Sequence, residues 1–188
     1  MSFLRVRTSF TGVTGSPWLS TMYFLQAAGA PTQANADAAV VKVGTYWTAI
    51  KAVMNNATSY TTLPDVAVLE TDGTLTGSFA TTPQTGTGAS ATDALPIASQ
   101  GLVRWLTGSF VSGRQLRGRT FLPALTETAS TGGVPTATVI GTINTANTAL
   151  IAATDPRLAV WSKVHTTVVT VSSASVWTQF AVLRSRRD

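Results

Sequence analysis

The spacing of apolar residues changes along the chain, and this change limits the folds that the sequence can adopt. Near the start, Leu4, Val6 and Phe10 alternate with polar residues, which is typical of a strand with one buried face. After residue 31 the apolar residues instead recur every three or four positions, which places them along one side of a helix. This helical stripe consists of Val40, Val43, Trp47, Ile50 and Met54.

The remaining segments extend this pattern. We predict helices near residues 33–54 and 138–153, the first capped by Thr32 or Asn35. Strands are expected at 4–10, 19–24, 101–111, 115–122, 166–171 and 176–183, and Asp72-Gly73 predicts a hairpin between "DVAVLE" and "LTGSFATT". Residues 81–100 are small, polar and rich in Gly and Pro, so we expect a long surface loop there.

The order of these elements indicates the fold class. About eight strands occur in neighbouring pairs, with two helical insertions, and they do not alternate with helices as βαβ units would. The chain of 188 residues is long enough for one core. We therefore predict a mainly β protein, a single domain spanning residues 1–188, built as an antiparallel sandwich or barrel.

The chain contains few charges. Asp, Glu, Lys and Arg make up 11% of the residues, against about a quarter in an average soluble protein. A surface with so little charge favours association, which suits a subunit that is covered by neighbouring subunits. Ten of the thirteen basic residues are arginine, the residue that grips phosphate or carboxylate with a planar fork.

Arginines gather in three parts of the sequence. The candidate site residues are Arg114, Arg117 and Arg119 beside Gly113 and Gly118, Arg184, Arg186 and Arg187 near the end, and Arg5 and Arg7 near the start. Guanidinium groups pair with phosphate oxygens without reading sequence, which favours a surface facing nucleic acid. The same residues are equally compatible with ion pairs at a subunit interface.

Catalysis is not predicted. A nucleophilic triad needs a base, and His165, the one histidine, lies among threonines in a predicted strand. The eight acidic residues include turn and helix-end positions, which leaves too few for paired carboxylates or a two-metal site. The chain has no cysteine and no apolar run of 18 residues, so we expect no thiolate metal site, no cofactor and no membrane span.

Three stretches resemble a family of viral proteins. They are "RVRTSFTGVTGSPWLSTMYF", "GRQLRGRTFLPAL" and "VTVSSASVWTQFAVLRSRR". In this order they resemble proteins encoded beside the replication protein in small circular single-stranded DNA viruses, which are interpreted as capsid subunits. The resemblance implies a single jelly-roll-like sandwich that assembles with copies of itself into an icosahedral shell around a nucleic-acid genome. It also implies that the protein is found in the virion, assembled in the host cell.

Two other functions fit the same residues. One is a phage tail or neck protein that forms a ring of fixed copy number. The other is a small nucleic-acid-binding module, whose affinity would fall steeply with salt. The symmetry of the assembled particle distinguishes the shell from the ring, and a monomer in solution would favour the module.

Overall fold

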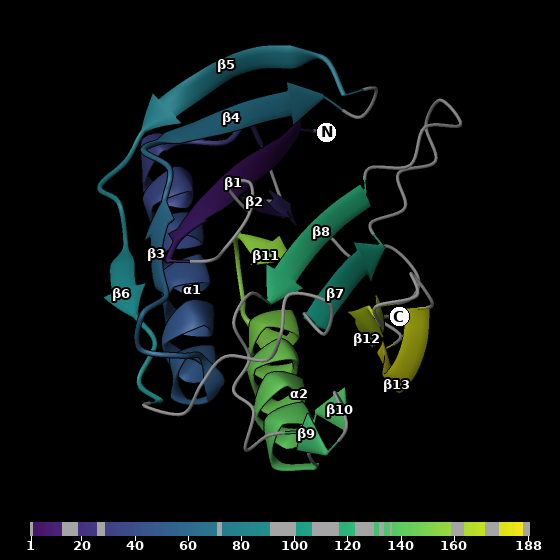
Figure 1. The fold of residues 1–188 in the computed structure, drawn as a ribbon. Helices are drawn as coiled ribbons and strands as arrows, with labels where there is room; N and C mark the ends of the chain where they lie inside the picture. The colour runs from purple at the N-terminus through teal and green to yellow at the C-terminus, as the bar shows by residue number, and fades with distance from the viewer. Residues whose placement is uncertain are drawn as a thin grey trace.

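The computed structural model describes residues 2–12, 19–25, 29–70, 73–90, 101–106, 117–122, 130–131, 134–135, 137–158, 164–171 and 177–185. Side chains are described at 2–12, 19–25, 29–70, 73–90 and 141–158, and the other segments by their backbone pairing. The described chain forms a seven-stranded, a four-stranded and a two-stranded sheet, with helices α1 and α2 (Figure 1). The protein is mainly β with two helices, as the sequence predicts.

Strand β1 (Ser2–Thr11) is the centre of the seven-stranded sheet. One edge of β1 pairs antiparallel with β2 (Leu19–Leu25) over most of its length. The other edge is shared, since β4 (Asp65–Glu70) pairs with its first half and β3 (Ser59–Thr62) with its second. The sheet therefore divides into two arms, of which β5 (Leu75–Ala80) extends one and β6 (Thr85–Thr87) the other.

Alternation along β1 separates the two faces of the sheet. The even-numbered residues Leu4, Val6, Thr8 and Phe10 are buried in the core, where they face the helices. The odd-numbered residues from Phe3 to Ser9 lie on the opposite face, because successive side chains of a strand point to opposite sides. Arg5 and Arg7 are thus kept away from the core by their parity.

Helix α1 (Gln33–Ile50) begins at a capping box and packs its apolar side on the sheet. Thr32 Oγ1 accepts a hydrogen bond from Asn35 N at 3.3 Å, and Asn35 Oδ1 accepts one from Thr32 N at 3.0 Å. The two caps proposed from the sequence therefore act as one unit. All five residues of the predicted apolar stripe are buried.

Trp47 joins α1 to β1. Its indole Nε1 donates to Thr8 Oγ1 at 3.1 Å, and both side chains are buried. Its ring lies edge-on to Phe10 and Tyr46, with centroid distances of 4.8 Å and 5.1 Å, and 6.1 Å from Tyr60. A tryptophan in such a place contributes large apolar area and satisfies a buried hydroxyl of the sheet.

Helix α2 (Ala137–Ala152) packs beside α1 and adds to the same core. Ile143, Ala146 and Leu150 of its predicted stripe are buried. After α2, the short strand β11 (Arg157–Leu158) pairs with β2. The chain thereby returns from the helix to the edge of the seven-stranded sheet.

The four-stranded sheet has the order β13-β12-β7-β8. Its strands are β7 (Gly101–Leu106), β8 (Arg117–Leu122), β12 (Val164–Val171) and β13 (Trp177–Ser185), all antiparallel to their neighbours. Strands β9 (Ser130–Thr131) and β10 (Val134–Pro135) form the two-stranded sheet. Cα atoms of β8 come within 8 Å of those of β2, so the larger two sheets lie side by side there (Figure 1).

The structure corrects the sequence prediction at several places, and strands β3, β6, β9, β10 and β11 were not predicted. The predicted helix 33–54 is α-helical to Ile50 and continues as the 3-10 turn η1 (Lys51–Val53), after which Met54 is extended. The predicted loop 81–100 contains strand β6, and residues 91–100 lie outside the described residues. Polar residues hold this segment to the core, since Gln84 N donates to Thr62 Oγ1 at 2.7 Å and Ser90 N to Met54 O at 3.0 Å.

Two glycines in this region permit close backbone contacts. Gly12 has a φ of +77°, and a Cβ there would lie 1.9 Å from Ala57 O. A Cβ at Gly88 would lie 2.1 Å from Asn55 O. A side chain at either position would push the end of β1, or the segment after β6, away from the turn at residues 55–58.

The Trp47–Thr8 bond predicts a specific loss of stability. Thr8→Val keeps the shape of the side chain but leaves the indole N–H buried without its acceptor, which we expect to lower the free energy of unfolding by about 1–3 kcal/mol. The matched control is Thr45→Val, because the Thr45 hydroxyl is exposed and bonds to the Val41 carbonyl of its own helix. Urea denaturation compares the variants, and equal midpoints for both would contradict this role of the bond.

Candidate nucleic-acid or subunit interface

Arg5 and Arg7 lie two positions apart on the face of β1 that points away from the helices. Two residues of a strand span about 7 Å, so the two guanidinium groups start from neighbouring points on one face. Both side chains are partly buried, and the Nε atom of each is buried without a hydrogen-bond partner.

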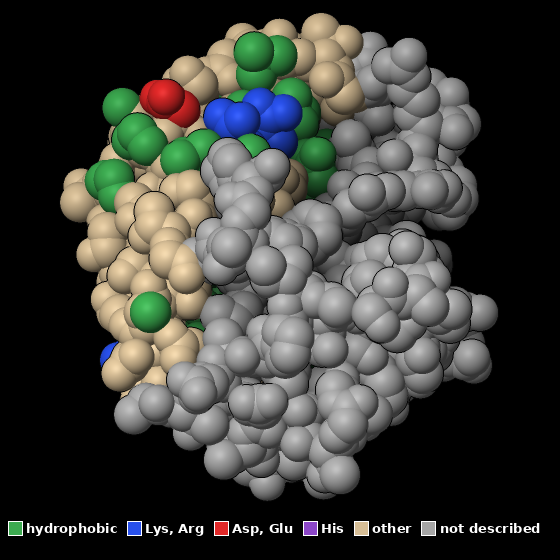
Figure 2. Space-filling view, in the orientation of Figure 1, with side chains coloured by type: hydrophobic (Ala, Val, Ile, Leu, Met, Phe, Trp, Pro, Cys, Tyr) green, Lys and Arg blue, Asp and Glu red, His purple; other side chains and the backbone are tan. Residues whose placement is uncertain are grey.

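The surroundings of this arginine pair are apolar and aromatic. Arg5 stands opposite Tyr23 on β2 and opposite Ala67 on β4. Phe3, Leu25 and Tyr23 pack together as a small cluster beside them. Figure 2 shows one patch of Lys and Arg side chains in its upper part, with hydrophobic side chains next to it.

The pKa of Tyr23 depends on its burial and on the charge of Arg5. Burial raises the pKa of the Tyr23 phenol, and the positive charge of Arg5 opposes this rise. The phenol thus stays neutral and can donate a hydrogen bond next to the guanidinium group. An anionic group placed here would meet two cations and one neutral donor.

Strand β8 brings two further predicted arginines close to this face. Arg117 and Arg119 lie on β8, which runs beside β2, and β2 is the immediate neighbour of β1. Four of the eight predicted site residues therefore lie on two strands that have β2 between them. Arg5 and Arg7 lie on β1, and Arg117 and Arg119 lie on β8. The hairpin register sets Arg119 opposite Arg104 of β7, a residue that the sequence analysis did not select.

Arg184 is farther away. It lies on β13 opposite His165 of β12, with β12 and β7 between it and β8. The antiparallel order puts it at the same end of the four-stranded sheet as the Leu106–Arg117 pair. Arg114, Arg186 and Arg187 lie outside the described residues.

Sequence reasoning missed Arg104 and Tyr23 for different reasons. Arg104 is a single charge inside the apolar run "LVRWL", and it lies outside the three clusters of arginine in the sequence. Its position opposite Arg119 depends on the register between β7 and β8. Tyr23 gains its role through pairing with Arg5 across two strands, which the sequence does not encode locally.

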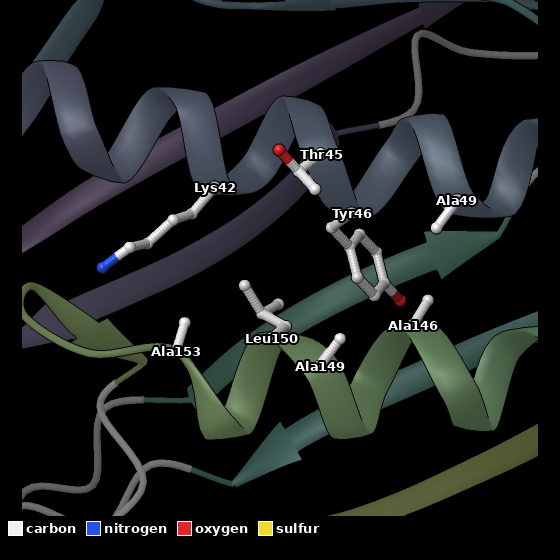
Figure 3. Close-up of a pocket in the computed structure, with 8 residues that line it drawn as sticks. All are labelled: Lys42, Thr45, Tyr46, Ala49, Ala146, Ala149, Leu150 and Ala153. Carbon is white, nitrogen blue, oxygen red and sulfur yellow. The ribbon is translucent and has the colours of Figure 1, made fainter.

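A groove lies between helices α1 and α2. It has a volume of about 130 Å³ and is lined by Lys42, Thr45, Tyr46, Ala49, Ala146, Ala149, Leu150 and Ala153 (Figure 3). Lys42 Nζ closes one end, donating to Thr154 O and, at 2.7 Å, to Pro156 O. These two bonds tie the chain that follows α2 to α1.

Half of the residues that line the groove are alanine. Its two ionisable groups are Lys42 and Tyr46. Burial lowers the pKa of Lys42, opposed by the charge of Asp155, and burial raises the pKa of the Tyr46 phenol far above its usual range. Among the described residues, no three His, Cys, Asp or Glu side chains are close enough to hold a metal ion.

Comparison with known proteins adds no relative. No family model, curated protein or solved structure matches the chain significantly. Within the described residues, no helix has the length and apolar character to cross a membrane. The arginine-bearing strands are therefore interpreted from their own geometry.

The buried Tyr46 predicts a pH dependence of stability. Its phenol stays neutral in the folded protein, whereas the unfolded chain ionises near pH 10, so stability is lost as the pH rises above 10. Tyr46→Phe should reduce the loss between pH 10 and 11 by about 1 kcal/mol. Chemical denaturation at both pH values measures this, with Thr45→Ala, another residue of the groove, as the control; an unchanged loss in Tyr46→Phe would contradict the prediction.

Proposed function

We propose that this chain is a structural subunit that assembles with copies of itself into a viral capsid, a closed shell around a nucleic-acid genome. The observation that carries the proposal is the pair Arg5 and Arg7, which lies on the sheet face opposite the helices with buried and unpaired Nε atoms. A charged group in such a place costs free energy unless a partner is supplied from outside the subunit. Phosphate oxygens or a neighbouring subunit would supply it.

Composition supports the same proposal. A surface with few charges is stable in solution when neighbouring subunits cover much of it. The excess of arginine over lysine favours forked contacts with phosphate or carboxylate. The role proposed is structural and without catalysis, and its place is the virion, assembled in the host cell.

The proposal includes a finer statement about the fold. We propose that the seven-stranded and four-stranded sheets belong to one jelly-roll-like sandwich domain of residues 1–188, in which α1 and α2 are insertions. The support is that both sheets are antiparallel and that β8 meets β2. An experimental structure of the assembled subunit tests this topology.

Particle imaging tests the function. The full chain is expressed, purified at near-physiological salt and examined by size-exclusion chromatography with light scattering and by negative-stain electron microscopy. We expect closed shells of icosahedral symmetry. Open rings would instead favour a tail or neck protein, and a monomer at micromolar concentration would overturn self-assembly and favour a nucleic-acid-binding module.

The arginine pair predicts how nucleic acid is held. For the double variant Arg5→Gln and Arg7→Gln, the log–log slope of binding against salt should fall by about 1.4 for single strands, because each phosphate contact contributes about 0.7. Particles of this variant should carry less nucleic acid, measured by the ratio of absorbance at 260 and 280 nm. The matched control is Lys51→Gln with Arg157→Gln, which removes two exposed cations from other places.

The possible results separate the two uses of the arginines. Shells that form with less nucleic acid assign Arg5 and Arg7 to the genome. Loss of shells together with retained folding assigns them to a subunit contact. Normal shells with normal nucleic-acid content would contradict their place in either interface.

A further inference from the structure

Strand β5 is the free edge of one arm of the seven-stranded sheet. It pairs with β4, and no other described strand pairs with its second edge. Figure 1 shows β5 along the outer margin of the molecule. Every residue of β5 is exposed except Phe79, which is partly buried against the core, and Leu75 is 61% exposed.

The ladder with β4 decides which amide groups of β5 are free. Thr81 N donates to Pro64 O at 2.7 Å, so this pair is hydrogen-bonded across the two strands. In an antiparallel ladder, hydrogen-bonded pairs alternate with pairs that are not hydrogen-bonded. Counting from Thr81, the next hydrogen-bonded residues of β5 are Phe79 and Gly77, so their amide groups point toward β4. The backbone groups of Ser78 therefore point away from the sheet, toward solvent. Those of Ala80 point the same way, and Ala80 O accepts a hydrogen bond from Gln33 Nε2 of α1 at 2.8 Å.

This edge lacks the devices that usually prevent strands from pairing. Protected edges carry lysine, proline or an inward charge, whereas "LTGSFA" contains none of these. Its one irregularity is a register shift opposite Val68 and Leu69, and the pairing of residues 77–80 is regular. The other free ends of this sheet are shorter, with three residues in β6 and two in β11.

We propose that β5 pairs antiparallel with β5 of a second copy of this chain, around a two-fold axis at Ser78. The inference rests on the proposed self-assembly and names one of its contacts. The axis sets Ser78 opposite its own copy and Gly77 of one chain opposite Phe79 of the other. An atom added at Gly77 would meet nothing within 4 Å, so the partner's Phe79 has room to cover this glycine.

The composition of the strand favours a second copy as the occupant. A two-fold axis brings equivalent residues close together, so a charged residue in β5 would lie near its own copy. Since β5 carries no charge, its self-pairing meets no repulsion, and a charged peptide would find no opposite charge on it. The contact is isologous, with the same backbone groups donating and accepting on both sides.

Pairing through β5 would also set where the β1 faces that carry Arg5 and Arg7 lie in the two copies. A two-fold axis at an antiparallel strand pair stands perpendicular to the sheet, so corresponding faces of both copies point to the same side. The order β1-β4-β5 in each copy separates the two β1 strands by five strand spacings, about 24 Å. Arg5 and Arg7 of both copies would then form one basic surface across the dimer.

A cysteine cross-link tests this register. The chain has no cysteine, so Ser78→Cys can form disulfides only between copies. Opposed residues of a hydrogen-bonded antiparallel pair have Cα atoms about 5.5 Å apart, which lies within disulfide range. We expect most of the oxidised Ser78→Cys chains to run as dimers on a non-reducing gel, and few of the control Thr82→Cys, whose copies would lie about 26 Å apart along the strands.

A second pair of variants tests the contact without a cross-link. Ser78→Lys sets two ammonium groups against each other and should abolish the dimer, whereas Ser78→Thr should keep it. Circular dichroism verifies that both variants fold, and light scattering measures their mass. A Ser78→Lys variant that is folded and still dimeric would overturn the pairing.

The outcomes distinguish this inference from the proposed function. If the unaltered chain forms particles and Ser78→Cys cross-links no better than Thr82→Cys, the β5 contact is wrong and assembly uses another surface. If the unaltered chain is a monomer, both proposals fail. If β5 accepts a strand from a different protein instead, Ser78→Cys stays monomeric when alone, which also overturns the inference.

Discussion

The fold depends on strand β1, whose two faces carry different kinds of side chains. Its even-numbered side chains enter the core, where Thr8 accepts the indole N–H of Trp47, and its odd-numbered side chains carry Arg5 and Arg7 on the opposite face. Both of its edges are paired, one with β2 and the other with β3 and β4 in succession. A shift of one residue in this register would bury the arginines and expose the core, so the packing of α1 also fixes where the charges lie.

This arrangement links stability to the proposed role. The Trp47 cluster holds α1 on one side of the sheet, and Lys42 ties the chain after α2 to α1. The opposite side holds two guanidinium groups whose Nε atoms have no partner within the described chain. A subunit of a shell needs such a rigid body with unsatisfied groups on its contact faces, because neighbours or genome complete them.

Local patterns predicted much of the fold. The recurrence of apolar residues every three or four positions around Trp47 identified α1 and its buried side. Alternation identified β1, with its arginines on the face opposite the core. Strand β3 was missed because "SYTT" consists mainly of hydroxyl residues, and its burial at Tyr60 and Thr62 comes from the strands on either side. The proximity of β8 to β2, and the pairing of Arg104 with Arg119, depend on contacts between distant segments that no local pattern contains.

The central claim is that the arginine face of β1 is completed from outside the subunit. A cryo-electron microscopy structure of the assembled particle tests it most directly, by the distances from the guanidinium nitrogens of Arg5 and Arg7 to their nearest acceptors. We expect phosphate oxygens or acceptors of a neighbouring subunit at about 2.7–3.0 Å. Guanidinium groups that stay in open solvent on the particle surface would contradict it.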